Sequence, residues 1–427
     1  MNLLKLNITD QERKTFRLHM GFSLLEGLMA GVVVLNEFIF IKSMLGSSYM
    51  LSFLWQFSMM VLLPTIIINE FVRRTKNKKK LLRLASIITR APLLILLLFP
   101  SDIEVITSNI IYHYIFLGLF LNYYLAWPII FPTINLYLKN SYSHENFSKL
   151  FSYATSAKSV VTMIGTFLFG LLLDHDPFSF RYIYPVIGIT GVISVILLSK
   201  ISFQIPEGQT FKKDLRSGVV DSLKRAWTNV WRNKGYRDFE LAFMFYGFAF
   251  MVTVSVITIF LEKEMHLNYS SLAFYKNGAV TISILLLPFF GKRLGKIDPR
   301  RFGVIPLLSL ALYLVFILLA EYYPVGTTIL GIQIYYPLVL AFIFFGLFAS
   351  TMTLLWSIGS AYFCKDEDAG DYQAVHLSLT GFRASFSPIL GIFFFELFGY
   401  TTTFVIGIIA LLLGVWVFRW SIRHRTV

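Results

Sequence analysis

Long apolar runs separated by short polar segments fill most of this chain of 427 residues. A helix that crosses a membrane needs about 20 mostly apolar residues to span about 30 Å of hydrocarbon. Because backbone polar groups in lipid must bond within the protein, continuous runs of that length favour helices. The pattern therefore predicts an all-α polytopic membrane protein with twelve transmembrane helices, at residues 18–42, 49–71, 82–100, 105–137, 149–173, 182–202, 238–261, 268–290, 302–320, 332–361, 373–397 and 400–420.

Lysine and arginine are concentrated in alternate connections between these spans. Most of the 38 basic residues lie in the N-terminal segment, the 72–83 loop, the central segment, the 292–301 loop and the C-terminal tail. The other connections hold only Lys42, Arg181 and Lys263. By the positive-inside rule, both termini and the central segment are then expected in the cytoplasm. The protein is expected to be integral to the inner or plasma membrane. A basic side that faces anionic lipid explains the net charge of +14, so we expect no nucleic-acid partner.

The two halves of the chain repeat each other at three places. The matched pairs are Leu117-Gly118-Leu119-Phe120 with Phe345-Gly346-Leu347-Phe348, Val186-Ile187-Gly188-Ile189 with Val405-Ile406-Gly407-Ile408, and Gly165 with Gly391. These repeats predict two pseudo-symmetric six-helix bundles, residues 1–202 and 238–427. Repeated bundles of this kind are typical of transporters that bind substrate near the bilayer midplane.

Two helices are predicted outside the spans. Residues 203–237 carry apolar side chains on one helical stripe and cations on the other, as in a basic amphipathic helix that lies on the membrane surface. This segment also serves as the cytoplasmic linker between the bundles. Thr9 and Glu12 have capping-box spacing, so a helix is expected to begin there and lead into the first span.

Six plus six spans, internal termini and a basic central loop resemble the major facilitator superfamily over nearly the whole chain. Its signature between the second and third helices is degenerate here: Lys78 and Lys79 provide the closing cations, while Glu70, Arg74 and Asn77 replace Gly, Asp and Gly. The second copy, between helices eight and nine, has Gly where Asp is usual but retains Gly291, Lys296 and Arg300. The resemblance implies solute transport by alternating access.

Charged residues within spans are costly and mark pathways or partners. Arg383 and Lys158 each lie about ten residues, or about 15 Å, into a span and occupy similar places in the two halves. Two such cations would suit a carboxylate or phosphate on the substrate; alternatively, Arg383 pairs permanently with an acidic side chain. Glu26 is the expected counter-charge and a candidate carrier of a coupling proton, or else it faces water. Arg90 is expected to snorkel to the cytoplasmic surface.

By the resemblance, the first, fourth, seventh and tenth helices line the substrate cavity. Aromatic and hydroxyl side chains there fit a ring-bearing solute, whereas the alternative is that they only pack helices together. These residues are Asn122, Tyr123, Tyr124, Trp127, Tyr246, Ser350, Thr353 and Trp356.

Enzymatic chemistry is poorly supported. Of the seven histidines only His113 lies plainly within a predicted span, none has metal-ligand spacing to another, and Cys364 is the single cysteine. No Walker phosphate-binding loop is present. We therefore expect no metal and no cofactor, and interpret the chain as a proton-coupled secondary transporter of a small anionic or ring-bearing solute. The alternatives are a lipid flippase with the same fold and, less favoured, a membrane-embedded enzyme.

Overall fold

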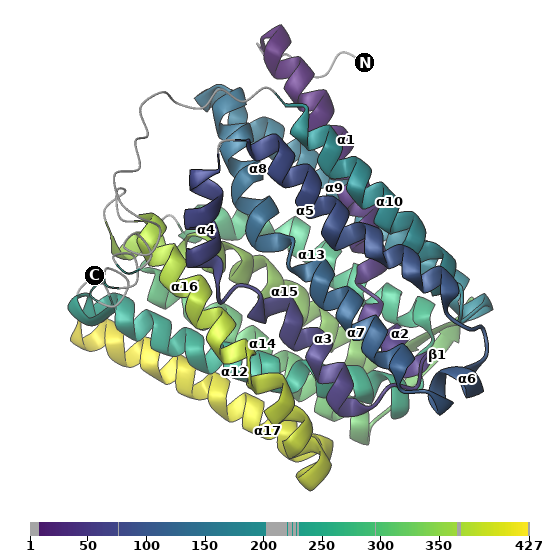
Figure 1. Ribbon diagram of the computed structural model, residues 1–427. Coiled ribbons are helices and arrows are strands. Elements are labelled where there is room, and N and C mark those ends of the chain that lie inside the picture. Colours follow the sequence, from purple (N-terminus) through teal and green to yellow (C-terminus); the bar gives the residue numbers. More distant parts are fainter. Residues whose placement is uncertain are drawn as a thin grey trace. The chain divides into compact units, whose positions relative to one another are not determined.

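The computed structural model describes residues 8–75, 77–201, 220, 224, 228, 230–294, 296–364 and 369–425. Nearly all of these residues are helical (Figure 1). The amphipathic stripe predicted over 203–237 lies outside the described residues apart from its last part. The chain divides into two compact units: unit 1 comprises residues 1–39 and 67–217, and unit 2 comprises residues 40–66 and 218–427.

All secondary-structure elements in the described part of unit 1 are helices. It includes α1, the first part of α2 and most of α4, because residues 40–66 belong to unit 2, and then α5 to α10. The elements are α1 (Asp10–Val33), α2 (Asn36–Lys42), α4 (Thr65–Arg74), α5 (Lys78–Arg90), η1 (Ala91–Leu98), α6 (Ile103–Ser108), α7 (Ile111–Tyr124), α8 (Trp127–Ser141), α9 (His144–His175) and α10 (Phe180–Ser199).

Unit 2 contains long helices and one small sheet. Its elements are α3 (Ser48–Met60), α12 (Lys234–Lys263), α13 (Tyr269–Leu294), α14 (Pro299–Tyr322), β1 (Gly326–Ile329), β2 (Ile332–Tyr335), α15 (Tyr336–Ile358), η2 (Gly359–Phe363), α16 (Ala369–Ala384) and α17 (Ser387–His424). In Figure 1 the yellow α17 runs alongside α12, and these two helices share the largest packing surface of the unit.

Ten helical segments among the described residues are long and apolar enough to cross a membrane. The last of them, Val375–His424, is 50 residues long, and Gly399 interrupts it with a φ of 79°. At about 20 residues per crossing, that length is enough for two spans. The predicted span 49–71 is split between α3 and α4, neither of which reaches 18 residues. The multi-pass helical architecture is thus present, while the count of twelve stays a prediction.

Two predicted spans differ from the observed elements. Residues 105–137 form parts of α6, α7 and α8 instead of one helix. The predicted span 332–361 begins with strand β2, which pairs antiparallel with β1, so the all-α prediction was wrong for this hairpin. Leu330 and Gly331 both have positive φ, as a tight two-residue hairpin turn requires. The alternating Ile332, Gln333 and Ile334 fit a strand better than a helix, a signal that the apolar composition concealed.

Glycines bring helix backbones into contact in both units. In unit 1, a Cβ at Gly27 would lie 2.6 Å from the carbonyl oxygen of Lys158, and Thr162 donates its hydroxyl to the carbonyl of Gly27. In unit 2, a Cβ at Gly391 of α17 would overlap the carbonyl of Val252 of α12. Small residues of this kind allow close packing of helices within a membrane.

The predicted capping box at the start of α1 is confirmed. The carboxylate of Glu12 accepts from the backbone N–H of Thr9 at 2.9 Å, and the hydroxyl of Thr9 accepts from the backbone N–H of Glu12 at 3.2 Å. The same carboxylate also accepts from the backbone and hydroxyl of Ser143, just before α9. The cap therefore joins the first helix to the connection between α8 and α9.

Candidate functional site

Arg383 lies near the end of α16 and is almost completely buried, with 3% of its surface exposed. Its Nη1 donates to the carbonyl of Phe243 at 2.7 Å, and its Nη2 donates to the hydroxyl of Thr380 at 3.2 Å. The guanidinium carbon lies 5.5 Å from the centre of the Tyr246 ring, in cation–π geometry. Its Nε is buried and makes no hydrogen bond to any described residue.

The charge of Arg383 is not matched by an ion pair. No carboxylate among the described residues forms a salt bridge with it, whereas other buried arginines, Arg90 and Arg300, each have one. The acidic partner required by a purely structural role is thus not found in the described part of the chain. Arg383 is held in place by a carbonyl, a hydroxyl and an aromatic face.

Gly247 on α12 makes room for this guanidinium. A Cβ at position 247 would overlap the Nε and Cζ atoms of Arg383. Glycine is therefore the residue that lets Arg383 approach the α12 backbone closely enough to reach the carbonyl of Phe243. The position of the Arg383 guanidinium therefore depends on the absence of a side chain at Gly247.

A second buried polar contact lies two turns away along the same two helices. Glu240 of α12 and His376 of α16 lie with Oε1 and Nδ1 3.0 Å apart, and their side chains are only 4% and 1% exposed. Glu240 precedes Gly247 by seven residues, as His376 precedes Arg383, so both pairs lie on the same facing sides. The other ring nitrogen of His376, Nε2, is buried without a partner among the described residues.

Aromatic rings surround these two polar contacts. The ring of Phe243 lies 4.8 Å from His376 and 5.6 Å from Tyr246, and thus connects them, while the ring of Trp356 on α15 lies 6.0 Å from His376. We call Glu240, Tyr246, Trp356, His376 and Arg383 the buried polar cluster. It combines a cation, a carboxylate–imidazole pair and two aromatic rings. All of its members except the half-buried Trp356 are buried, and charge interactions are stronger in a protein interior than in water.

Ser350 and Thr353 on α15 make different contacts from those of the cluster. The hydroxyl of Ser350 donates to the carbonyl of Leu347 at 2.8 Å, and that of Thr353 donates to the carbonyl of Ala349 at 2.7 Å. Both donors are therefore satisfied by their own helix. Ser350 is buried and Thr353 is exposed.

In unit 1, Glu26 of α1 pairs with Arg90 of α5. The Arg90 Nη1 lies 2.5 Å from Oε1 and Nη2 lies 3.2 Å from Oε2, in a bidentate arrangement. Ser194 donates its hydroxyl to the same carboxylate, and Arg90 also donates to the carbonyl of Gly191. Glu26 thus has its counter-charge within its own unit.

The expectation that Arg90 snorkels to the surface was wrong. Arg90 is 2% exposed and points into unit 1, where a Cβ at Gly191 would lie 2.9 Å from its Cδ. The glycine leaves the space that the side chain occupies. The position of Arg90 near the end of its predicted span suggested that it reaches the membrane surface. The space that it occupies, at Gly191, and its partner, Glu26, lie on α10 and α1, which are distant in sequence.

The remaining predicted residues of unit 1 form no comparable site. Tyr123, Tyr124 and Trp127 are in successive edge-to-face contact, with ring centres 5.3 and 5.1 Å apart. Asn122 donates to the carbonyl of Ile88 at 2.8 Å. Lys158 is half-buried on α9, and its Nζ makes no ion pair or hydrogen bond to the described residues.

Sequence reasoning missed three members of the site: Glu240, His376 and Gly247. Glu240 and His376 lie two and three residues inside predicted spans. The prediction that only His113 lies plainly within a span was wrong for His376, which is buried in α16, and for His19, which is buried in α1. The usable signal was the equal seven-residue spacing from Glu240 to Gly247 and from His376 to Arg383. This spacing predicts the two contacts only once α12 and α16 are known to pack against each other.

The sequence model of the Major Facilitator Superfamily matches residues 15–332 of this chain. The chain belongs to the Major Facilitator Superfamily. As a member, it is an integral multi-pass membrane protein, and membership supports a transport function with a small-molecule substrate over an enzymatic one. No curated protein sequence matches it significantly.

Solved structures of other superfamily transporters share its fold. The nucleoside transporter NupG is 13% identical with a TM-score of 0.65, covering 98% of this chain and 100% of its own. The peptide transporter POT in complex with sulfate is 13% identical with a TM-score of 0.69, covering 98% and 96%. The human organic anion transporter MFSD10 is 11% identical with a TM-score of 0.63, covering 95% and 99%. At these identities the likeness shows the fold alone.

Proposed function

We propose that this protein is a secondary active transporter that carries a small anionic solute by alternating access, and that Arg383 binds the carboxylate or phosphate of that solute. The observation that supports this most directly is the burial of Arg383 without an acidic partner among the described residues. A buried cation that forms no ion pair is expensive. An anionic substrate that supplies the missing charge gives a reason to keep it, and the planar guanidinium suits bidentate binding.

The rings beside Arg383 suggest a solute with a flat or apolar part. Tyr246 stacks with the guanidinium, and the rings of Phe250 and Phe348 continue the aromatic surface at centre distances of 6.2 and 5.8 Å from Tyr246. Of the similar structures, POT was crystallised with sulfate and MFSD10 is an organic anion transporter. These names agree with an anionic substrate class.

The substrate prediction is tested by thermal shift on purified protein, with wild type compared with Arg383→Ala and Arg383→Lys. A ligand at a hundred times its Kd stabilises the folded state by about 2.7 kcal/mol. We expect one or more anionic solutes from a panel of organic anions, nucleosides, sugars, amino acids and lipids to shift the wild type. The Ala variant should lose the shift, and the Lys variant should retain part of it because it keeps the charge without the fork.

The control for that experiment is Arg17→Ala, an exposed arginine on α1 of unit 1. It should keep every shift. If a well-folded Arg383→Ala variant also keeps every shift, Arg383 does not bind substrate. If only lipids shift the wild type, a lipid transporter replaces the proposal.

We further propose that Glu240 and His376 together carry the coupling proton, a role first expected for Glu26. The bidentate contact with Arg90 favours a structural role for Glu26, whereas Glu240 faces a histidine that can itself gain or lose a proton. Titratable or charged groups of the described residues near this pair include Tyr236, whose hydroxyl donates to the carbonyl of Tyr372, and Arg383, on which the Glu240 charge acts. A change in the charge of this pair therefore changes the electrostatic potential at Arg383, the cation proposed to bind the substrate.

Proton coupling is tested in proteoliposomes with the solute identified above. We expect Glu240→Gln and His376→Gln to lose accumulation driven by a pH gradient while they keep exchange of labelled for unlabelled solute, which needs no net proton movement. The control is Glu262→Gln, on α12 near its other end. A Glu240→Gln variant that still concentrates solute in response to the pH gradient would show that the pair is not the coupling site.

A further inference from the structure

Two basic pockets lie together at one end of unit 2. The larger, about 790 Å³, is lined by residues 232–235, at the start of α12, and by residues 422–425, at the end of α17. The smaller, about 370 Å³, lies at the start of α14, between residues 296–301 and the same end of α17. Ile422 and Arg425 line both pockets, so the two form one continuous surface, which we call the basic end-face.

Cations greatly outnumber acids on the basic end-face. Among the described residues, the only acidic side chain that lines either pocket is Asp298, and Arg300 donates to both of its oxygens, with Nη2 2.7 Å from Oδ2. Five further lining cations form no ion pair with any described residue. They are Arg232, Lys234, Lys296, Arg301 and Arg423.

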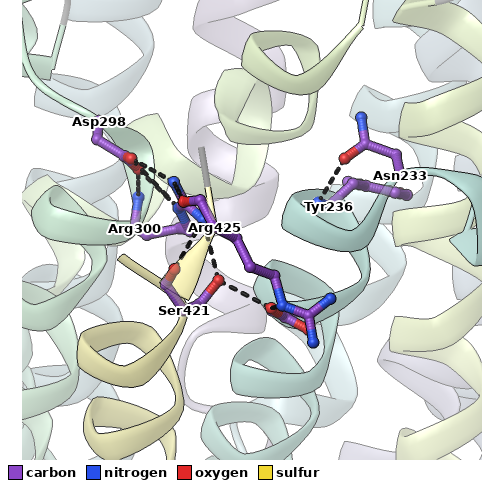
Figure 2. A network of polar contacts seen from close by, with 7 residues as sticks. Asn233, Tyr236, Asp298, Arg300, Ser421 and Arg425 are labelled. Atoms are coloured by element: carbon purple, nitrogen blue, oxygen red, sulfur yellow. Dashed lines mark hydrogen bonds and ion pairs between the residues drawn. The ribbon is translucent and has the colours of Figure 1, made fainter. Parts of the chain in front are cut away.

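A network of hydrogen bonds and ion pairs lies at the centre of this surface (Figure 2). Arg300 donates from Nη1 to the hydroxyl of Ser421 at 2.9 Å and from Nη2 to the carbonyl of Arg425 at 3.1 Å. Asp238, buried at the start of α12, accepts from Ser421 and from Nε of Arg425, each at 2.9 Å. These bonds join the ends of α12, α14 and α17, so the end-face is built before any ligand arrives.

Arg425 keeps an unused donor within this network. Its Nη1 is buried and has no hydrogen-bond partner among the described residues. Because Nε is taken by Asp238, the orientation of the guanidinium is set. The positive charge of this fixed guanidinium adds to that of the unpaired cations beside it, and clustered cations at a helix end attract a phosphate group.

The position of the end-face indicates where the phosphate comes from. α12, α14 and α17 can each cross a membrane, and the pockets lie where these helices end. Trp231, which is exposed, and Trp420, whose ring lies 5.0 Å from the guanidinium of Arg425, flank the cations. Tryptophan gathers at the level of lipid head groups, and basic pockets at helix ends bind anionic ones.

We propose that the basic end-face is a specific binding site for the phosphate head group of an anionic phospholipid. The head group would lie over Arg232, Lys234 and Arg425, and its acyl chains would extend along the apolar surface of the helices. This site is separate from the buried polar cluster and does not depend on the identity of the transported solute.

The test uses the full-length protein in detergent with defined lipids added. The probe is phosphatidylglycerol, and phosphatidylcholine is the zwitterionic reference. The variant is Arg232→Gln with Lys234→Gln, because both residues are exposed and neither takes part in the polar network. Its matched control is Lys79→Gln with Lys80→Gln, the same charge change on two exposed lysines at the start of α5 in unit 1.

We expect native mass spectrometry to show phosphatidylglycerol bound to wild type and control, and about thirtyfold weaker binding to the Arg232/Lys234 variant, since each of the two cations contributes about 1 kcal/mol near a head group and every 1.4 kcal/mol is about a factor of ten. Melting temperature should rise with phosphatidylglycerol in the same two proteins and much less in the variant. Equal lipid binding by variant and control would overturn the site. A rise produced as strongly by inorganic phosphate alone would overturn the assignment to lipid.

Discussion

Arg90→Met is expected to lower the free energy of unfolding by about 3–5 kcal/mol, the range for breaking a buried ion pair by removing one partner. Among the described residues, the substitution leaves Ser194 as the remaining hydrogen-bond donor to the carboxylate of Glu26, in a part of α1 that lies within a predicted span. It also removes the donor that holds the carbonyl of Gly191. The measurement is denaturant unfolding of the purified protein in lipid–detergent mixtures.

The double variant Arg90→Met with Glu26→Met distinguishes the cost of an unpaired buried charge from the cost of altered side-chain packing. Replacing both charged partners with apolar side chains of similar size is often nearly neutral, so most of the lost stability should return. Arg17→Met, on an exposed part of α1, serves as the control and should change stability little. A single Arg90→Met variant that is no less stable than this control would mean that the pair contributes nothing to folding.

Gly247→Ala is expected to abolish binding of the anionic solute and to destabilise the protein by about 1–3 kcal/mol, as overpacking of a core usually does. The added methyl overlaps the Nε and Cζ atoms of Arg383, so the guanidinium must leave the carbonyl of Phe243 and the face of Tyr246. Ligand-induced thermal shift and denaturant unfolding measure the two effects separately.

Two further variants test whether the overlap with Arg383 causes these effects. In Gly247→Ala with Arg383→Ala the overlap is gone, so stability should recover while solute binding stays absent. Gly278→Ala, on α13, is the matched control because a Cβ there meets nothing within 4 Å. It should leave both measurements unchanged. Solute binding that survives in the Gly247→Ala variant would separate Arg383 from the substrate.

The membrane class and the general positions of most spans could be predicted from sequence because lipid imposes a simple requirement on each segment. About 20 apolar residues must follow one another, and local composition reports this directly. The capping box of Thr9 and Glu12 was predictable for a similar reason, since both partners lie within one turn. The hairpin at 326–335 was missed because its second strand, Ile332–Tyr335, runs directly into the apolar helix α15.

The pairing of charged residues could not be predicted in this way. Glu26 and Arg90 are 64 residues apart, and Glu240 and His376 are 136 apart, so only the packing of helices brings them together. Arg383 was identifiable because an arginine deep in a span is costly wherever it points. Gly247, which positions it, is one glycine among 27 and has no local feature that distinguishes it.

The close glycine contacts in each unit determine which parts of the molecule can bend. Where α1 meets α9, the hydroxyls of Thr162 and Thr166 donate to the carbonyls of Gly27 and Gly31, and a Cβ at either glycine would lie 2.6 Å from a carbonyl oxygen of α9, so the two backbones pack closely. Such a helix pair should move as one stiff rod. Bending within a unit must then be absorbed at interruptions such as residues 61–64 and Gly399. Spin labels on α1 and α9 should therefore keep a fixed separation throughout the transport cycle.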